Sequence, residues 1–391
     1  MHKVKQAGFH RPSASHEFYL VAGRPARLTE VEIALRKDLW VRCVLAYQSV
    51  SIAKGHLPAR VFGSVGGYLT ETPDRSLELQ LKCQDIVVQC CTAVTENGLL
   101  GIMSDDQGRA INIIVRVFDT RLRDLEVEAL TSIASRAKLG LADLPFLTTT
   151  EHLIFQSARL DVQVFSLFVS HPPKPTDFED PIALLASTAR TVLDLIRKLV
   201  NIPSFPPSPP NYVVDALMIA SFTVLRIFKT DLGGLRMTDA EDCIDSCKHL
   251  ARSLSSNEND ALSKTATMLE DLWRHGNAYK KPDGTKDVPI SFLGRLNAGL
   301  VIDAAWKWFD IVNVLPENGM PAPAEGACIV SSATSQSLAP SLVHSNIVPS
   351  SAFMAIGDGY PLSLFDDDIF GDFNWMMSGD DLYARCDGNF R

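Results

Sequence analysis

Apolar residues recur at a spacing of three and four positions along most of this 391-residue chain, and no other feature constrains its fold as strongly. Alternation with a period of two, which is typical of strands, is nearly absent. Clear helical stripes are formed by Leu79, Cys83, Ile86, Val87, Cys90 and Val94, and by Leu185, Val192, Leu193, Ile196 and Leu199. The sequence therefore predicts an all-α fold: an irregular multi-helix body, without a fixed-period repeat, between disordered termini.

Capping signals mark several helix ends within this pattern. Thr29 and Glu32 have the spacing of a capping box, and the helix that they open is expected to end near Gly55. Residues 180–181, Asp-Pro, predict another helix start, and residues 238–241 predict a second capping box. Residues 203–210 are rich in proline and are expected to form a non-helical connector.

The charge of the chain is concentrated near its C-terminal end. The formal net charge is −9, and residues 308–384 contain ten acidic residues but no Lys or Arg. The remainder is close to neutral, which argues against nonspecific binding of a polyanion by the chain as a whole.

The cysteines are expected to be reduced core residues rather than metal ligands. Eight are present, mostly within apolar helical stripes, and no C-x-x-C pair occurs. Cys243 and Cys247, with His249 nearby, have the spacing of a helix face, but a buried apolar face explains them better because no second ligand pair is in view. Cys90 and Cys91 are likewise interpreted as core. No secretory signal and no apolar run long enough to cross a membrane is found, so no membrane partner is expected.

Composition divides the chain into four segments. Residues 1–22 are predicted to be a flexible N-terminal segment, and residues 23–315 an all-helical regulatory domain. Residues 316–360 are predicted to be a linker rich in Pro, Ala and Ser, and residues 361–391 are predicted to be an acidic-aromatic activation segment.

The last segment interleaves large hydrophobic side chains with aspartates, a composition typical of acidic activation domains. Repulsion between the aspartates keeps the apolar side chains solvated, so that a coactivator with an apolar groove and a basic rim can order a short helix. The alternative is that the segment docks on the body as a final core helix. The candidate partner-binding residues are Phe365, Asp366, Asp367, Asp368, Ile369, Phe370, Asp372, Phe373, Trp375, Met376 and Met377.

The sequence gives little support for an enzymatic function, and no catalytic residue is predicted. Asp366, Asp367 and Asp368 superficially resemble the aspartate-rich magnesium site of terpene synthases, which makes an all-α magnesium-dependent enzyme one alternative. They lie beyond the predicted linker, however, without a second metal-binding motif. Residues 63–67, Gly-Ser-Val-Gly-Gly, are read as a loop between helices because no P-loop Lys-Ser/Thr follows them.

Several stretches resemble the middle region of fungal zinc-cluster transcription factors. Within that family they are most similar to the regulators of leucine biosynthesis and of the weak-acid response. These stretches are residues 17–25, 36–43, 47–51 and 212–229, and the resemblance covers about residues 16–315. It implies a nuclear regulator whose middle region restrains an activation segment until a small-molecule effector or stress signal arrives. Proteins of this family often control secondary-metabolite, stress or metabolic genes.

The chain departs from this family in one respect. The zinc cluster requires six cysteines, and that pattern is absent, so the chain is expected either to be truncated at its start or to lack its own DNA-binding module. Zinc is expected only with a missing upstream module, and DNA contact only through such a module or a partner. A helical small-molecule-binding module without an activating role is a further alternative.

Overall fold

A computed structural model describes residues 20–21, 24–25, 29–58, 75–97, 105–138, 148–169, 180–232, 237–281, 283–286, 290 and 295–314. The predicted all-α class is confirmed for these residues. The helices are α2 (Glu30–Ala53), α4 (Arg75–Glu96), α5 (Asp105–Lys138), α6 (Thr149–Gln163), α7 (Pro181–Val200), α8 (Asn211–Thr230), α9 (Met237–Leu254), α10 (Ala261–Arg274) and α11 (Ala298–Val314), and a 3-10 helix, η2 (Val164–Phe168), continues α6.

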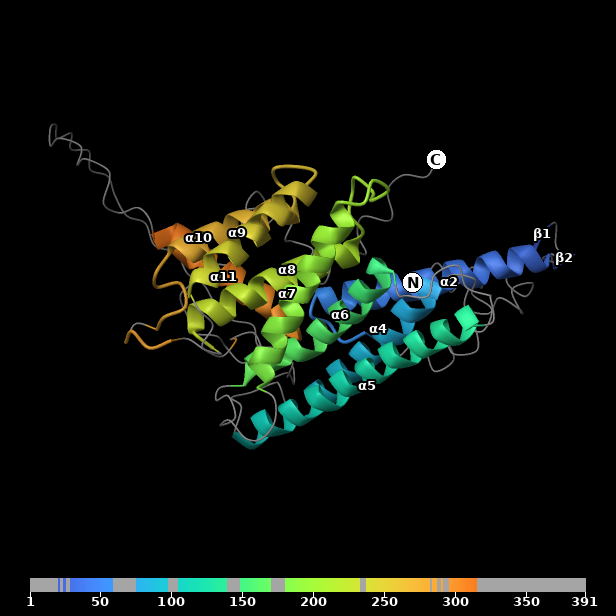
Figure 1. Ribbon diagram of the computed structural model, residues 1–391, viewed down its shortest axis with the longest axis horizontal. Coiled ribbons are helices and arrows are strands. Elements are labelled where there is room, and N and C mark those ends of the chain that lie inside the picture. Colours follow the sequence, from blue (N-terminus) through green and yellow to red (C-terminus); the bar gives the residue numbers. More distant parts are fainter. Residues whose placement is uncertain are drawn as a thin grey trace, which may run out of the picture.

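The helices form an irregular bundle around α8 (Figure 1). The long α5 runs along one side, next to α4 and α6, while α9, α10 and α11 lie on the other side of the α7–α8 pair. Two strands that the periodicity did not predict, β1 (Leu20–Val21) and β2 (Arg24–Pro25), pair antiparallel at the outer end of α2. The predicted linker, residues 316–360, and the acidic-aromatic segment, residues 361–391, lie outside the described residues.

Two of the predicted helix starts are confirmed. The backbone N–H of Thr29 donates to Glu32 Oε2 (2.8 Å), and the N–H of Glu32 donates to Thr29 Oγ1 (3.3 Å), which completes the capping box of α2. At α7, the N–H of Ile182 donates to Asp180 Oδ1 (2.9 Å), and Pro181 occupies the first helical position. Residues 203–210 form turns rather than helix, as expected.

The capping box predicted for residues 238–241 is wrong. Helix α9 begins at Met237, so Thr238 lies inside the helix and is not its N-cap residue. Asp239 still lies in the first turn, where its negative charge opposes the positive end of the helix dipole. A box that the sequence did not single out opens α6 instead: Thr148 N–H donates to Glu151 (2.7 Å), and Glu151 N–H donates to Thr148 Oγ1 (3.2 Å).

Helix α8 is buried along almost its whole length, and its one arginine is fully enclosed. Arg226 of α8 forms an ion pair with Asp303 of α11, which is 1% exposed. The guanidinium also lies over the ring of Tyr279, 4.7 Å from its centroid. Because neither charge has access to solvent, each depends on the other for compensation.

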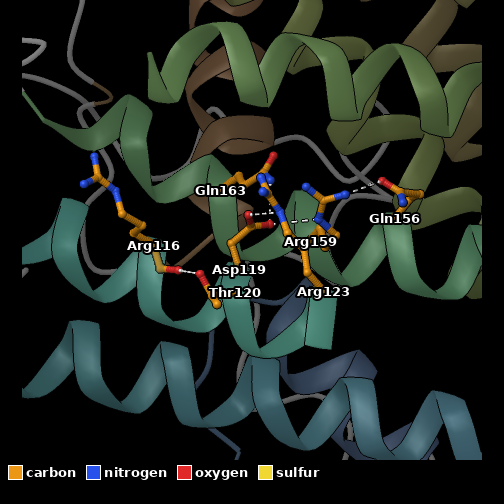
Figure 2. A network of polar contacts seen from close by, with 7 residues as sticks. All are labelled: Arg116, Asp119, Thr120, Arg123, Gln156, Arg159 and Gln163. Atoms are coloured by element: carbon orange, nitrogen blue, oxygen red, sulfur yellow. Dashed lines mark hydrogen bonds and ion pairs between the residues drawn. The ribbon is translucent and has the colours of Figure 1, made fainter. Parts of the chain in front are cut away.

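A second buried carboxylate joins α5 to α6 (Figure 2). Asp119 Oδ1 accepts from Arg159 Nε (2.9 Å) and from Gln163 Nε2 (2.7 Å), and its Oδ2 lies 3.0 Å from Arg123 Nε. Asp119 is 4% exposed, so these donors replace the water that its carboxylate lost on folding. This network is a structural connection between the two helices.

The α8–α11 ion pair yields a stability prediction. We expect Asp303→Asn to lower the free energy of unfolding by about 3–5 kcal/mol, because it leaves the Arg226 charge buried and uncompensated. Urea unfolding followed by circular dichroism measures this loss. The control is Asp194→Asn, which breaks the exposed Arg197–Asp194 pair (2.7 Å) and should cost less than about 1 kcal/mol. Equal losses in both variants would contradict the assignment.

A close backbone contact fixes the C-terminal end of α2, which ends near Gly55 as predicted. Gly55 has φ +69°, and a Cβ built on it would lie 2.4 Å from the backbone oxygen of Arg295. Next to Arg295, Leu296 has φ +50°, a strained conformation for a residue with a side chain. The turn that precedes α11 is thus held directly against α2.

This contact can be tested with two matched glycine variants. Gly284 also has a positive φ (+81°), but no atom lies within 4 Å of a Cβ built on it. We expect Gly284→Ala to cost about 1–2 kcal/mol from the left-handed backbone alone. Gly55→Ala should cost more than Gly284→Ala, because the new Cβ also displaces the turn at Arg295. Denaturant midpoints of the two variants measure the difference, and equal midpoints would disprove the contact.

Candidate ligand-binding cavity

A small cavity of about 70 Å³ lies where α2, α4, α6 and α8 meet the turn that precedes α11. A water molecule needs roughly 10–15 Å³ on this measure, so the space holds several waters or a small polar ligand. Its polar lining consists of Ser49, Gln80, Gln84, Ser157, Asp161, Tyr212, Asp215 and Asn297, and its apolar lining includes Ile52, Ile154 and Ile219.

Asn297 anchors one side of this cavity. Its Nδ2 donates to Asp161 Oδ1 (2.8 Å), and the residue is 1% exposed. Its Oδ1 has no hydrogen-bond partner among the described residues, and the same holds for the Oγ of Ser157 on α6. A buried polar atom without a partner costs free energy, so these two atoms are acceptor positions that a ligand can satisfy.

The turn before α11 determines where Asn297 lies. The N–H of Gly299 donates to the carbonyl of Leu296 (3.0 Å), and the N–H of Leu300 donates to the carbonyl of Asn297 (3.3 Å). Together with the Gly55–Arg295 contact, these bonds hold Asn297 at the cavity, and Asn297 in turn positions Asp161.

Two carboxyl groups face the cavity without a cation beside them. Burial raises the pKa of Asp161 to about 7; the hydrogen bond from Asn297 opposes this shift, and the charge of Asp215 adds to it. Burial also raises the pKa of Asp215 to about 7. Both side chains keep partial exposure. Near neutral pH each group is therefore close to the midpoint of its titration.

The other buried acids differ from this pair because each has an arginine. Asp119 has Arg159, Asp303 has Arg226, and Glu151 lies 3.2 Å from Arg75 Nε. In contrast, Asp161 and Asp215 form no ion pair within the described part of the chain. The acids with a purely structural role are each paired with an arginine, whereas Asp161 and Asp215 are not paired with a cation among the described residues.

The remaining titratable residues of the lining are neutral at physiological pH. Burial raises the pKa of Cys83 on α4 to about 12, and it also raises the pKa of Tyr212 on α8 above its usual value. Among the described residues, no Lys, Arg or His lines the cavity. The described part of the lining thus offers hydrogen-bonding groups and negative charge, but no positive charge.

The structure does not place the residues proposed from the sequence. The candidate coactivator-binding residues from Phe365 to Met377 lie outside the described residues, as does the loop at residues 63–67. The same holds for Asp366, Asp367 and Asp368, the aspartates of the alternative magnesium site. Their roles remain predictions.

The interpretation of the paired cysteines as core residues is confirmed. Cys90, Cys91 and Cys247 are buried, and Cys243 packs against the same core, whereas His249 is exposed. The hydrogen bond with Cys247 and the nearby Arg190 and Arg197 lower the pKa of Cys243 to about 7 against the opposing effect of burial. Within the described ranges, no group of three or more His, Cys, Asp or Glu side chains could hold a metal ion.

Sequence reasoning missed Asp161, Asp215 and Asn297, although one signal was present. Asp215 is the only charged residue between Asn211 and Leu225 in a strongly apolar helix, and Asp161 lies between the buried Leu160 and Val162. An isolated acid in such a stretch needs a partner or a function. That both acids meet Asn297 depends on tertiary packing, which periodicity does not show.

No family model, curated protein or solved structure matches the chain. None of the described helices is both long enough and apolar enough to cross a membrane.

The raised pKa values predict how stability depends on pH. Between about pH 4 and pH 7 the folded state keeps protons on Asp161 and Asp215 that the unfolded state has released, so both groups reduce stability as pH rises through this range. We expect Asp215→Asn to raise stability by about 1–2 kcal/mol at pH 8 and to change it little at pH 5.

Thermal unfolding at both pH values measures this effect. The control is Asp106→Asn, because Asp106 has an 87% exposed side chain and its replacement should not produce such a pH-dependent gain. A gain for Asp215→Asn that is equal at pH 5 and pH 8 would refute the titration assigned to this carboxyl group.

Proposed function

We propose that this chain is a transcriptional regulator whose helical body binds a small-molecule effector and thereby controls an acidic activation segment. The observation that carries the effector-binding part is the cavity with its uncompensated carboxyls and the unpartnered Oδ1 of Asn297. Titratable groups in a pocket whose pKa values are strongly perturbed are candidates for a functional site.

The regulatory part of the proposal rests on the sequence. The resemblance to the middle region of zinc-cluster transcription factors and the aromatic residues between aspartates in residues 361–391 both favour a nuclear activator that recruits coactivators. In this proposal DNA is reached through a separate module or a partner protein.

Asn297 connects the cavity with the last described helix before the activation segment. Asn297 immediately precedes α11, which is the last described helix before residues 316–391. Helix α11 is held by the Asp303–Arg226 ion pair and by Trp308 Nε1, which donates to Asp271 Oδ2 (2.8 Å). A ligand that contacts Asn297 therefore acts directly on the start of the helix that leads toward the tail.

The activation role can be tested in a reporter assay. We fuse the chain to an unrelated DNA-binding domain and expect deletion of residues 361–391 to reduce activation to that of the DNA-binding domain alone. Deletion of residues 316–346 removes the same length from the linker and should leave most of the activity. Unchanged activation after loss of residues 361–391 would show that the activator role is wrong.

The effector-binding role is tested with the full chain and a mixed pool of small metabolites. We expect the pool to raise the midpoint of thermal unfolding of the wild-type protein, because a ligand that binds only the folded state stabilises it. Ala216→Phe fills the cavity, since Ala216 is a lining residue that is 5% exposed, and it should abolish the shift. A shift that persists in this variant, or no shift in the wild type, would argue against a ligand in the cavity.

A further inference from the structure

We propose that the ligand of this cavity is a small organic cation, an ammonium group on a short aliphatic chain, held by Asp161, Asp215 and Asn297. This inference rests on the proposed function, because it names the chemical class of the effector for the same site. The donors, acceptors and apolar surface that line the cavity support it.

Besides the amide groups of Gln80 and Gln84 and the hydroxyl of Tyr212, the cavity offers several free acceptor positions. Asp161 uses Oδ1 to accept from Asn297 and keeps Oδ2, while Asp215 has neither a hydrogen bond nor an ion pair among the described residues. The unpartnered Asn297 Oδ1 and Ser157 Oγ add two further acceptor atoms. An ammonium group has three N–H donors and a positive charge, and it therefore matches this set.

The lining also disfavours other ligand classes. An anion would face two carboxyl groups without any Lys, Arg or His among the described lining residues. A bare metal ion would find only two carboxylates, and no cluster of three or more metal-ligating side chains occurs in the described parts of the chain. The apolar Ile52, Ile154 and Ile219 provide a surface for the carbon chain of an organic cation.

Binding of such a cation is coupled to proton release. Below about pH 7 the two carboxyls carry protons, since burial raises the pKa of both groups to about 7. When an ammonium group arrives, one carboxylic acid loses its proton to solvent, and the carboxylate forms the ion pair. The charge inside the cavity is then balanced.

The other groups around the cavity do not take part in this titration. Cys83 and Tyr212 keep their protons near neutral pH, because burial raises the pKa of each. The buried thiols of Cys90 and Cys91 on α4 lie near Asp161, and burial raises the pKa of both thiols as well. From α2, only Ser49 and apolar side chains reach the lining.

Two basic residues lie at the contact between α2 and the turn before α11. Lys54 and Arg295 lie beside His56, whose pKa is lowered by burial and by their charges. Neither Lys54 nor Arg295 lines the cavity. Among the described residues no cation faces the two carboxyls, and a cationic ligand would supply the missing charge.

The charge of the ligand is tested with three compounds of similar size. Isothermal titration of the full chain uses n-butylammonium, n-butanol and n-butyrate, together with the ethyl and propyl homologues of the ammonium ion. We expect binding of at least one ammonium ion to be at least about tenfold tighter than that of the matched alcohol, and no binding of the acid anion. Titrations in buffers of different ionisation enthalpy should show release of up to about one proton at pH 6 and almost none at pH 8.5.

Isosteric variants assign the binding to these residues. Asp161→Asn and Asp215→Asn should each weaken ammonium binding at least about tenfold, whereas Asp242→Asn on the exposed face of α9 should leave it unchanged. Circular dichroism shows whether each variant is folded, and the series of ligands on the wild-type protein tests the charge preference without any variant.

The outcomes separate this inference from the proposed function. If the alcohol or the acid binds as tightly as the ammonium ion, or if Mg²⁺ or Ca²⁺ alone competes for the site, the cavity binds a ligand but the organic-cation assignment is wrong. If no ammonium ion binds at millimolar concentration while the metabolite pool still stabilises the wild type but not Ala216→Phe, the cation assignment fails and the effector role stands. If neither the pool nor any of these compounds binds, both proposals fail.

Discussion

Helix α8 lies in the middle of the bundle and is almost entirely buried, so its charged side chains cannot rely on water for compensation. Water reaches little of its length, so a charged side chain needs a partner from a neighbouring helix. Arg226 pairs with the carboxylate of Asp303 and lies over the ring of Tyr279. Asp215, three turns earlier on the same helix, has no such partner among the described residues. Its carboxyl group faces the cavity instead.

The sequence was sufficient for the fold class and for several helix ends, because these depend on local physics. Thr29 with Glu32, and Asp180 with Pro181, satisfy backbone groups within a few residues of themselves, so their pattern alone predicts the structure. Helix α9 shows the limit of this reasoning, since its Thr-x-x-Glu sequence occurs one residue inside the helix rather than at its cap. Terminal residues of helices are the positions that local patterns fix least well.

The candidate site could not be predicted in the same way. Asp161, Asp215 and Asn297 come from α6, α8 and the turn before α11, which are far apart in the sequence and meet only after the bundle has packed. The turn itself depends on Gly55, because only a residue without a Cβ allows α2 to approach Arg295 so closely. A lone aspartate in an apolar helix was a visible sign, but nothing local shows which residues it meets.

The environment of Cys243 has a practical consequence. Its thiol is only partly buried and has a pKa of about 7, whereas the thiols of Cys83, Cys90, Cys91 and Cys247 are enclosed and have raised pKa values. Because the thiolate is the form that reacts with electrophiles, a maleimide or iodoacetamide reagent will distinguish Cys243 from these four at neutral pH. A fluorophore attached there would report on the packing of α9 against α7 from a position that contributes nothing to the cavity lining.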